Sequence, residues 1–132
     1  MGLGTQVKGH IERRFSTTWK SPGPRLREYV QSLRSIWDCW SDGRRLDYQG
    51  RYYQFSLMTP FFSPGPSQYP PPPVYTGAVN AYNCRVAGEV CDGLMLHTLT
   101  SADYLRDVVR PNLARGAQRA GQIGRASCRE RV

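Results

Sequence analysis

The strongest constraint on the fold is a strand–helix–strand pattern in the middle of the chain. Four prolines, Pro70–Pro73, end in a short apolar run, Val74–Thr76, and a second apolar run follows at Gly93–Thr98. Between the two runs, Asn80 can cap a helix that is predicted to continue to about Val90. Two apolar strands joined by a helix are typical of a right-handed crossover between parallel neighbours. The pattern therefore predicts a parallel α/β sheet.

An amphipathic helix is predicted upstream of this unit, from Ser21 to Gly43. Prolines stand at its start and Gly43 at its end, and apolar residues recur between them at spacings of three and four. Such a stripe is typical of a helix face that packs against a core. Its members are Leu26, Tyr29, Val30, Leu33, Ile36, Trp37 and Trp40.

Three further segments flank these elements. Residues 1–7 are predicted to form a short strand that runs into a loop. Residues 46–55 contain two alternating runs, and Gln49–Gly50 between them predicts a tight hairpin turn. Residues 59–73 are rich in proline and cannot pair as a central strand, so they are predicted to be an extended connector.

A last helix is predicted after Thr100. Thr100 and Asp103 have the spacing of a capping box, with Asp in the place of the usual Glu or Gln. Pro111 is expected to kink or split this helix because proline lacks a backbone N–H. The predicted order is strand, helix, hairpin, strand, helix, strand, helix. Two or three such βα units do not close a sheet, so we expect the chain to be part of a larger fold.

The charge of the chain raises the possibility of a polyanionic partner. The 132 residues carry a net charge of +8, with an isoelectric point near 9.7. The basic residues are scattered, however, and many stand beside acids, which favours a solvated basic surface over a nucleic-acid-binding face. No apolar run is long enough for a transmembrane span, and the N-terminus does not resemble a signal peptide.

The cysteines favour free thiols over a metal site. They are Cys39, Cys84, Cys91 and Cys128. No pair forms a CxxC motif, and His10 and His97 are the only histidines that could complete a zinc site, so no metal is predicted. Buried free thiols without a signal peptide indicate the cytoplasm.

The C-terminal segment IGRASCRERV, residues 123–132, has neither a helical nor a strand period. It resembles the translated read of a sequencing adapter, and we interpret it as a non-native tail. Without it the net charge falls from +8 to +6, which weakens the argument for a polyanionic partner. Residues 1–122 are therefore taken as the domain.

Two turns carry residues that can reach a ligand. In parallel α/β folds ligands bind beyond the carboxyl ends of the strands, so Gln6, Lys8 and His10 after the first strand are well placed. In the second turn, Gly77–Asn80, small residues let the backbone approach a ligand, and the first N–H groups of the following helix face it. That arrangement suits a phosphate group. An ordinary polar loop in the first turn, and packing alone in the second, remain alternatives.

Five segments that occur in this order carry a family resemblance. They are LGTQVKGHIERRF (3–15), LREYVQSLRSIWDCW (26–40), LDYQGRYYQFSLMTP (46–60), PPPVYTGAV (71–79) and RVAGEVCDGLMLH (85–97). Together they resemble the luciferase-like monooxygenase superfamily, and within it the F420-dependent oxidoreductase branch. The resemblance covers residues 1 to about 120.

The resemblance implies an eight-stranded (β/α)8 barrel, a fold of about 250 residues, so the chain would be an incomplete barrel with central βα units. The hairpin and the proline-rich connector would be the family's insertion. The implied cofactor is F420, a deazaflavin, with FMN as the alternative. Its phosphate would meet Gly77, Ala78, Val79 and Asn80.

The loop from Thr5 through Gln6 and Lys8 to His10 would, by the same resemblance, line the cofactor and substrate side. His10 is the candidate catalytic residue, as a hydrogen-bond or proton donor. Relatives often carry glycine at the positions of Val79 and Asn80. A positive φ at Val79 would be strained, so the turn is expected to differ from its glycine-containing counterparts.

The implied activity is hydride transfer between the cofactor and an unknown small organic substrate. An FMN-dependent monooxygenase is the alternative within the family, and a basic nucleic-acid-binding module is the alternative from another class. We expect a small-molecule substrate, no nucleic acid and no membrane partner, and a homodimer of the parent protein is left open. Residues of the reactive face would lie on strands outside this chain.

Overall fold

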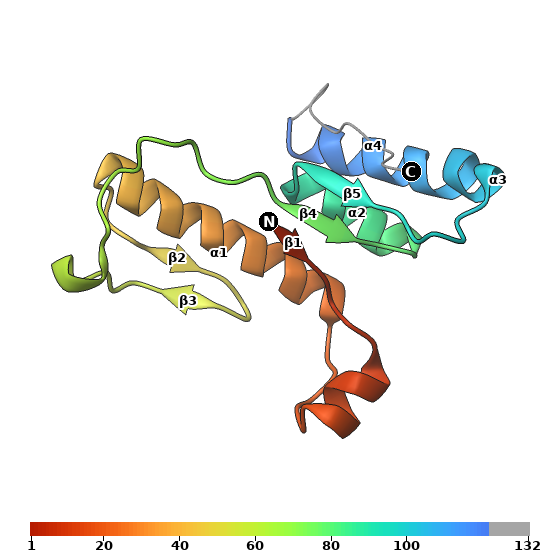
Figure 1. Ribbon diagram of the computed structural model, residues 1–132, viewed down its shortest axis with the longest axis horizontal. Helices are drawn as coiled ribbons and strands as arrows, with labels where there is room; N and C mark the ends of the chain where they lie inside the picture. Colours follow the sequence, from red (N-terminus) through yellow and green to blue (C-terminus); the bar gives the residue numbers. More distant parts are fainter. Residues whose placement is uncertain (122–132) are drawn as a thin grey trace. The chain divides into compact units, whose positions relative to one another are not determined.

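The computed structural model describes residues 1–121 and divides them into two compact units (Figure 1). The first unit combines residues 1–27 with the described chain from Pro73 onward, and the second is residues 28–72. The elements in chain order are β1 (Gly2–Leu3), the π-helical turn η1 (His10–Arg14), α1 (Pro22–Asp42), β2 (Tyr48–Gln49), β3 (Gln54–Phe55), the 3-10 turn η2 (Pro60–Phe62), β4 (Tyr75–Gly77), α2 (Ala81–Val90), β5 (Gly93–Met95), α3 (Ala102–Tyr104), the π-helical segment η3 (Leu105–Val109) and α4 (Arg110–Arg119). The order of strands and helices is the predicted one, with η1 and η2 as unpredicted additions; η2 lies in the connector that was predicted to be extended.

The first unit contains a three-stranded parallel sheet in the order β1-β4-β5. Thr76 in β4 is fully buried and is opposite Leu3 of β1 and Leu94 of β5. Asp92 holds the start of β4 beside β5. Its backbone N–H donates to the Val74 carbonyl, and its carboxylate accepts from the Val74 N–H, both at 2.8 Å. The predicted parallel sheet is confirmed, although β5 ends at Met95 because the chain turns there toward the final helix.

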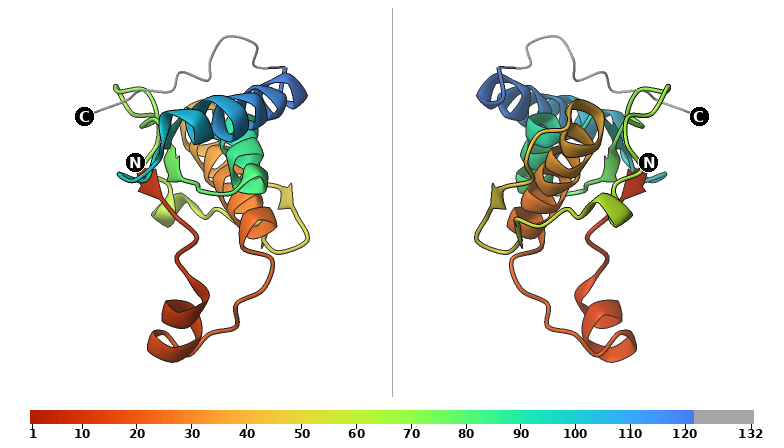
Figure 2. Two further views of the ribbon diagram at one scale, coloured as in Figure 1. Left: turned by 90° about the vertical axis from the view of Figure 1, so that its right-hand side faces the viewer. Right: turned by 90° about the vertical axis from the view of Figure 1, so that its left-hand side faces the viewer.

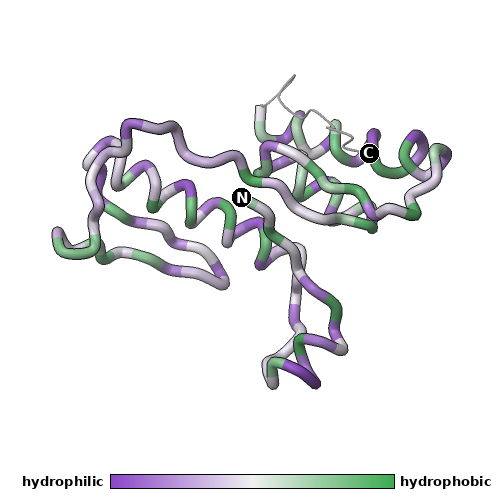
Figure 3. The backbone as a smooth tube through the Cα atoms, viewed as in Figure 1, coloured by the Kyte–Doolittle hydropathy of each residue, from purple (hydrophilic) through white to green (hydrophobic). Residues whose placement is uncertain are grey.

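Helix α1 confirms the predicted helix almost to the residue. It begins at Pro22, where a missing N–H has no cost, and ends before Gly43, which has the positive φ of 65° that favours glycine. Hydrophobic and hydrophilic stretches alternate along the helix in Figure 3. Of its apolar stripe, Leu26 and Val30 are buried.

The hairpin of the second unit forms with a different turn from the predicted one. Gln49 pairs with Gln54, so the turn is Gly50–Tyr53, and the predicted two-residue turn at Gln49–Gly50 is wrong. The Glu28 carboxylate accepts hydrogen bonds from three successive backbone N–H groups of this turn, at 2.7–3.3 Å. A methyl group at Gly50 would overlap that carboxylate. An acid on α1 therefore shapes the turn, which no local pattern reveals.

The final helix also corrects the prediction. Ser101 is the N-cap, and its hydroxyl accepts from the Tyr104 N–H at 3.2 Å, so the predicted cap at Thr100 is wrong by one residue. Thr100 is already part of the preceding turn, where its N–H donates to the His97 carbonyl at 2.9 Å. Pro111 lies in the first turn of α4, directly after η3. The proline thus marks a change from π- to α-helical geometry.

Helices α2 and α4 lie side by side (Figures 1 and 2). Two buried glycines form their contact: a methyl group at Gly88 would overlap the carbonyl oxygen of Leu113, and one at Gly116 would overlap that of Arg85. The helices therefore touch through their backbones. The core beside this contact consists of Ala78, Cys84, Ala87, Leu94, Val109 and Leu113.

The cysteine and tail predictions have different outcomes. Cys84 and Cys91 are buried, Cys39 is half-buried, and none of these three forms a disulfide, as the sequence indicated. Burial raises the pKa of the Cys84 thiol. Cys128 and the predicted non-native tail, residues 123–132, lie outside the described residues.

Within residues 1–121 no helix has the length and apolar character needed to cross a membrane.

Replacing Gly88 with alanine is expected to destabilise the full-length protein by about 3 kcal/mol, because the added methyl group has to push two helix backbones apart. Urea unfolding with a matched Gly9→Ala control measures this. Gly9 has a φ of −60°, and nothing lies within 4 Å of an added methyl group there. Equal stability of the two variants would contradict the backbone contact.

Candidate functional site

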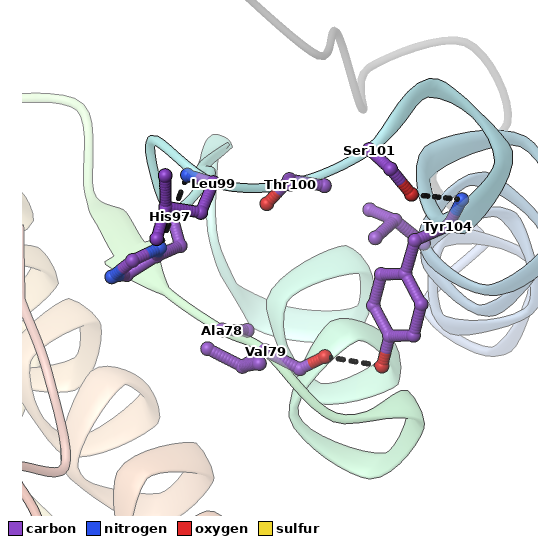
Figure 4. Close-up of a pocket in the computed structure, with 8 residues that line it drawn as sticks. Ala78, Val79, His97, Leu99, Thr100, Ser101 and Tyr104 are labelled. Carbon is purple, nitrogen blue, oxygen red and sulfur yellow. Dashed lines mark hydrogen bonds between the residues drawn. The ribbon is translucent and has the colours of Figure 1, made fainter.

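A cavity of about 600 Å³ opens beyond the carboxyl ends of β4 and β5 (Figure 4). Parallel sheets place their ligands at this edge. One wall comes from the turn after β4, and the other comes from the segment that links β5 to the final helix. The lining residues are Ala78, Val79, His97, Leu99, Thr100, Ser101, Tyr104 and Val109.

His97 stands on the turn that follows β5. The Leu99 N–H donates to Nδ1 of the ring at 3.2 Å, so Nδ1 carries no proton in this arrangement. In the neutral ring the proton is therefore on Nε2, and that atom is a hydrogen-bond donor. The residue is exposed, so the donor is accessible.

Tyr104 connects the two walls. Its hydroxyl donates to the carbonyl oxygen of Val79 at 2.8 Å, across the cavity from His97 in Figure 4. The carbonyl of Val79 and the N–H of Asn80 belong to one planar trans peptide and point in opposite directions. The hydrogen bond therefore turns the Asn80 N–H away from Tyr104.

The turn Gly77–Asn80 is built without a left-handed residue. Asn80 has φ −91° and ψ 160°, and no residue of the turn has a positive φ. The strain considered for Val79 therefore does not arise. An added methyl group at Gly77 would meet nothing within 4 Å, so the backbone there is open to a ligand.

Asn80 caps α2 as predicted. Its side-chain oxygen accepts from the Asn83 N–H at 2.8 Å, and its carbonyl accepts from the Cys84 N–H at 3.0 Å. The N–H groups of Ala81 and Tyr82, at the first helical positions, have no acceptor within the helix. These groups and the helix dipole give the start of α2 a positive potential.

The other predicted residues lie on the loop after β1, the strand next to β4. Thr5 donates its hydroxyl to the Gln6 carbonyl at 3.3 Å, and Gln6 has the left-handed φ of 59°. Lys8 forms an exposed ion pair with Glu12 at 3.9 Å, and His10 begins η1. None of these four predicted residues lines the cavity. Figure 2 shows this loop and η1 extending away from the strand.

The structure thus separates the predicted site residues into two groups. Ala78 and Val79 line the cavity, and Gly77 and Asn80 belong to the same turn. Thr5, Gln6, Lys8 and His10 stand after the adjacent strand.

Sequence reasoning missed a further group of lining residues, namely His97, Thr100, Ser101 and Tyr104. The apolar run predicted at Gly93–Thr98 placed His97 inside a strand. Because β5 ends at Met95, His97 instead follows the carboxyl end of the strand, where ligands of parallel sheets bind. In the described part of the chain, no group of three His, Cys, Asp or Glu side chains is placed to hold a metal ion.

The cavity lining carries no Asp, Glu, Lys or Arg among the described residues. The nearest charges in the chain follow Ser101. Arg106 pairs with Asp103 at 2.8 Å and with Asp107 at 2.7 Å. Its hydrogen bonds to Asp107 and then Asp103 raise the pKa of Arg106. With Arg110, which follows Val109 directly, this segment has two acids and two bases.

Comparison with known proteins assigns the family. The profile of the family described as luciferase-like monooxygenase matches residues 1–127, so the chain belongs to this family. A solved F420-dependent secondary alcohol dehydrogenase, in complex with an F420-acetone adduct, matches with a TM-score of 0.73 and 21% identity. The match covers 92% of this chain and 35% of the other. The fold is therefore the expected partial α/β barrel.

Several curated proteins are also similar to this chain. An uncharacterised protein of Mycobacterium tuberculosis is 45% identical over 122 residues, 92% of this chain and 36% of the relative. The 5,10-methylenetetrahydromethanopterin reductase of Archaeoglobus fulgidus is 28% identical over 122 residues, 92% of this chain and 33% of the relative. An F420-dependent glucose-6-phosphate dehydrogenase of Segniliparus rotundus is 31% identical over 98 residues, 74% of this chain and 27% of the relative. The chain spans 27–36% of the length of these proteins.

Replacing Tyr104 with phenylalanine is expected to loosen the turn after β4, because the hydroxyl that holds the Val79 carbonyl is lost. Amide hydrogen exchange at residues 79–82 of the full-length protein should become about five- to tenfold faster, as expected for one hydrogen bond. Tyr69→Phe is the control, since Tyr69 is 71% exposed and lies in the second unit. Unchanged exchange in Tyr104→Phe would show that the hydrogen bond does not order the turn.

Proposed function

We propose that the parent protein is an F420-dependent oxidoreductase that acts on a small organic substrate. The observation that carries the proposal is the open turn at Gly77–Asn80, which leads directly into α2 beside a cavity at the carboxyl edge of a luciferase-like sheet. Family membership and the F420-dependent enzymes among the relatives support it. When bound, F420 supplies hydride transfer, and the protein binds and orients the reactants.

The described residues fit the phosphate end of such a cofactor. The unpaired N–H groups at the start of α2 and the positive end of its dipole favour an anion. The space beside Gly77 lets an anion approach the backbone. The side-chain oxygen of Asn80 is engaged in capping, so the proposed contacts come from backbone N–H groups.

The loop after β1 supplies the second part of the proposed site. Thr5, Gln6 and Lys8 follow the strand next to β4 and are proposed to contact the cofactor on that side. The ammonium group of Lys8 would offset negative charge. His10 is proposed to donate a hydrogen bond or a proton to the ring or the substrate.

F420 is preferred over FMN because the relatives that are named for a cofactor are named for F420. Titrating the full-length protein with F420 and FMN in parallel tests this choice. Binding of FMN in preference to F420 would contradict it. The buried Cys84 thiol, which forms no disulfide, supports a cytoplasmic location as part of the proposal.

Replacing Asn80 with aspartate is expected to weaken F420 binding about five- to tenfold, because it adds a negative charge beside the proposed phosphate. Aspartate is as good an N-cap as asparagine, so the helix is kept. The Kd is measured from F420 fluorescence with full-length protein.

Asn80→Ser is the matched control for this change. Serine keeps the cap without adding a charge and should leave the Kd nearly unchanged. An Asn80→Asp variant that binds F420 as tightly as the wild type would remove the assignment of this turn to the phosphate.

Residues 1–122 alone are expected to be inactive. Within the described residues, β1 and β5 are each paired along one edge, and a barrel requires pairing along both. Thermal unfolding and F420 titration of this segment test the expectation. A cooperative transition together with tight cofactor binding would contradict it.

A further inference from the structure

We propose that the cavity between the turn after β4 and the start of the final helix binds an uncharged alcohol or carbonyl compound, whose oxygen accepts a hydrogen bond from His97. The proposal rests on the proposed function, because it names the substrate class for that site. It adds that the site discriminates against phosphorylated substrates.

The chemistry of the lining favours an uncharged ligand. Ala78, Val79, Leu99 and Val109 supply apolar surface, and the polar members of the lining are an imidazole and three hydroxyl-bearing side chains. Ligand sites of this kind bind apolar groups and orient them through a few polar contacts. A phosphate dianion would lose its hydration here without gaining a cationic partner from the described lining residues.

The guanidinium group beside the cavity lining is already engaged by carboxylates. Arg106 is the cation closest in sequence to Tyr104, and it pairs with both Asp103 and Asp107. An incoming anion would therefore have to compete with two carboxylates for this guanidinium.

A hydrogen bond orients the imidazole ring of His97. Since Nδ1 accepts from the Leu99 N–H, the neutral ring presents Nε2–H as a donor. An alcohol or carbonyl oxygen can accept from it. The hydroxyl protons of Thr100 and Ser101 are further donors in the same lining.

Calorimetric titration of the full-length protein, with F420 already bound, tests the proposal. Cyclohexanone is the uncharged probe, and glucose 6-phosphate is the phosphorylated probe. We expect cyclohexanone to bind at least about tenfold more tightly, a difference of roughly 1.4 kcal/mol. Equal or tighter binding of glucose 6-phosphate would overturn the proposal, and so would the failure of cyclohexanone to bind.

Two variants of His97 locate the contact. His97→Leu is expected to lower cyclohexanone affinity about three- to tenfold, whereas His97→Gln keeps an N–H donor and should retain most of it. The Kd for F420 should stay unchanged in both. Equal losses of cyclohexanone affinity in the two variants would remove the hydrogen bond from the proposal.

Two lysine substitutions test directly whether the cavity discriminates against phosphorylated compounds. Leu99 is 86% exposed and lines the cavity, so Leu99→Lys should raise glucose 6-phosphate affinity about tenfold through a new ion pair. Leu57→Lys adds the same charge to the second unit, at a residue that is 78% exposed, and should have no effect. An equal gain in both variants would contradict a local effect of the cavity.

The two proposals fail in different ways. If F420 does not bind, cyclohexanone is titrated into the protein alone; binding with the expected dependence on His97 then means that the F420 assignment fails and the cavity assignment stands. If F420 binds with the expected dependence on Asn80 but cyclohexanone does not bind, the substrate class fails alone.

Discussion

The backbone contact between α2 and α4 is the constraint on which the first unit depends. Gly88 and Gly116 let the two helices approach until each glycine lies against a carbonyl group of the other helix. This distance fixes where the final helix runs relative to the β4–α2 unit. It thereby sets the position of Tyr104, whose hydroxyl reaches the Val79 carbonyl, and of Val109 in the cavity wall. A wider helix pair would open the cavity and break this connection.

The carboxyl edge of the sheet combines two kinds of chemistry. The start of α2 offers backbone N–H groups and a positive dipole, which suit an anion. The adjacent cavity is neutral and largely apolar, with His97 as an oriented donor. Tyr104 stands at the boundary, because its hydrogen bond turns one peptide so that the carbonyl faces Tyr104 and the N–H faces away. One short turn can therefore separate an anion subsite from a neutral one.

Much of this fold could be predicted because the signals are local. The period of the apolar residues in α1 and the cap at Asn80 are properties of a few neighbouring residues, and both elements formed as predicted. One error arose where a distant residue decides, and another arose within a single turn. The hairpin turn follows the Glu28 carboxylate, which lies more than twenty residues away in sequence. The cap at Ser101 follows the turn at His97, which occupies Thr100.

The sequence by itself determined the order of strands and helices, the parallel crossover, and the turn at Gly77–Asn80, because period, capping and strand–helix alternation act over short stretches of chain. The tertiary structure alone decided which residues share a cavity. His97 and Tyr104 meet the turn after β4 only once β5 pairs with β4 and the glycines bring α4 against α2. Such juxtapositions depend on packing between elements far apart in sequence, and no local pattern encodes the distance between two helix backbones.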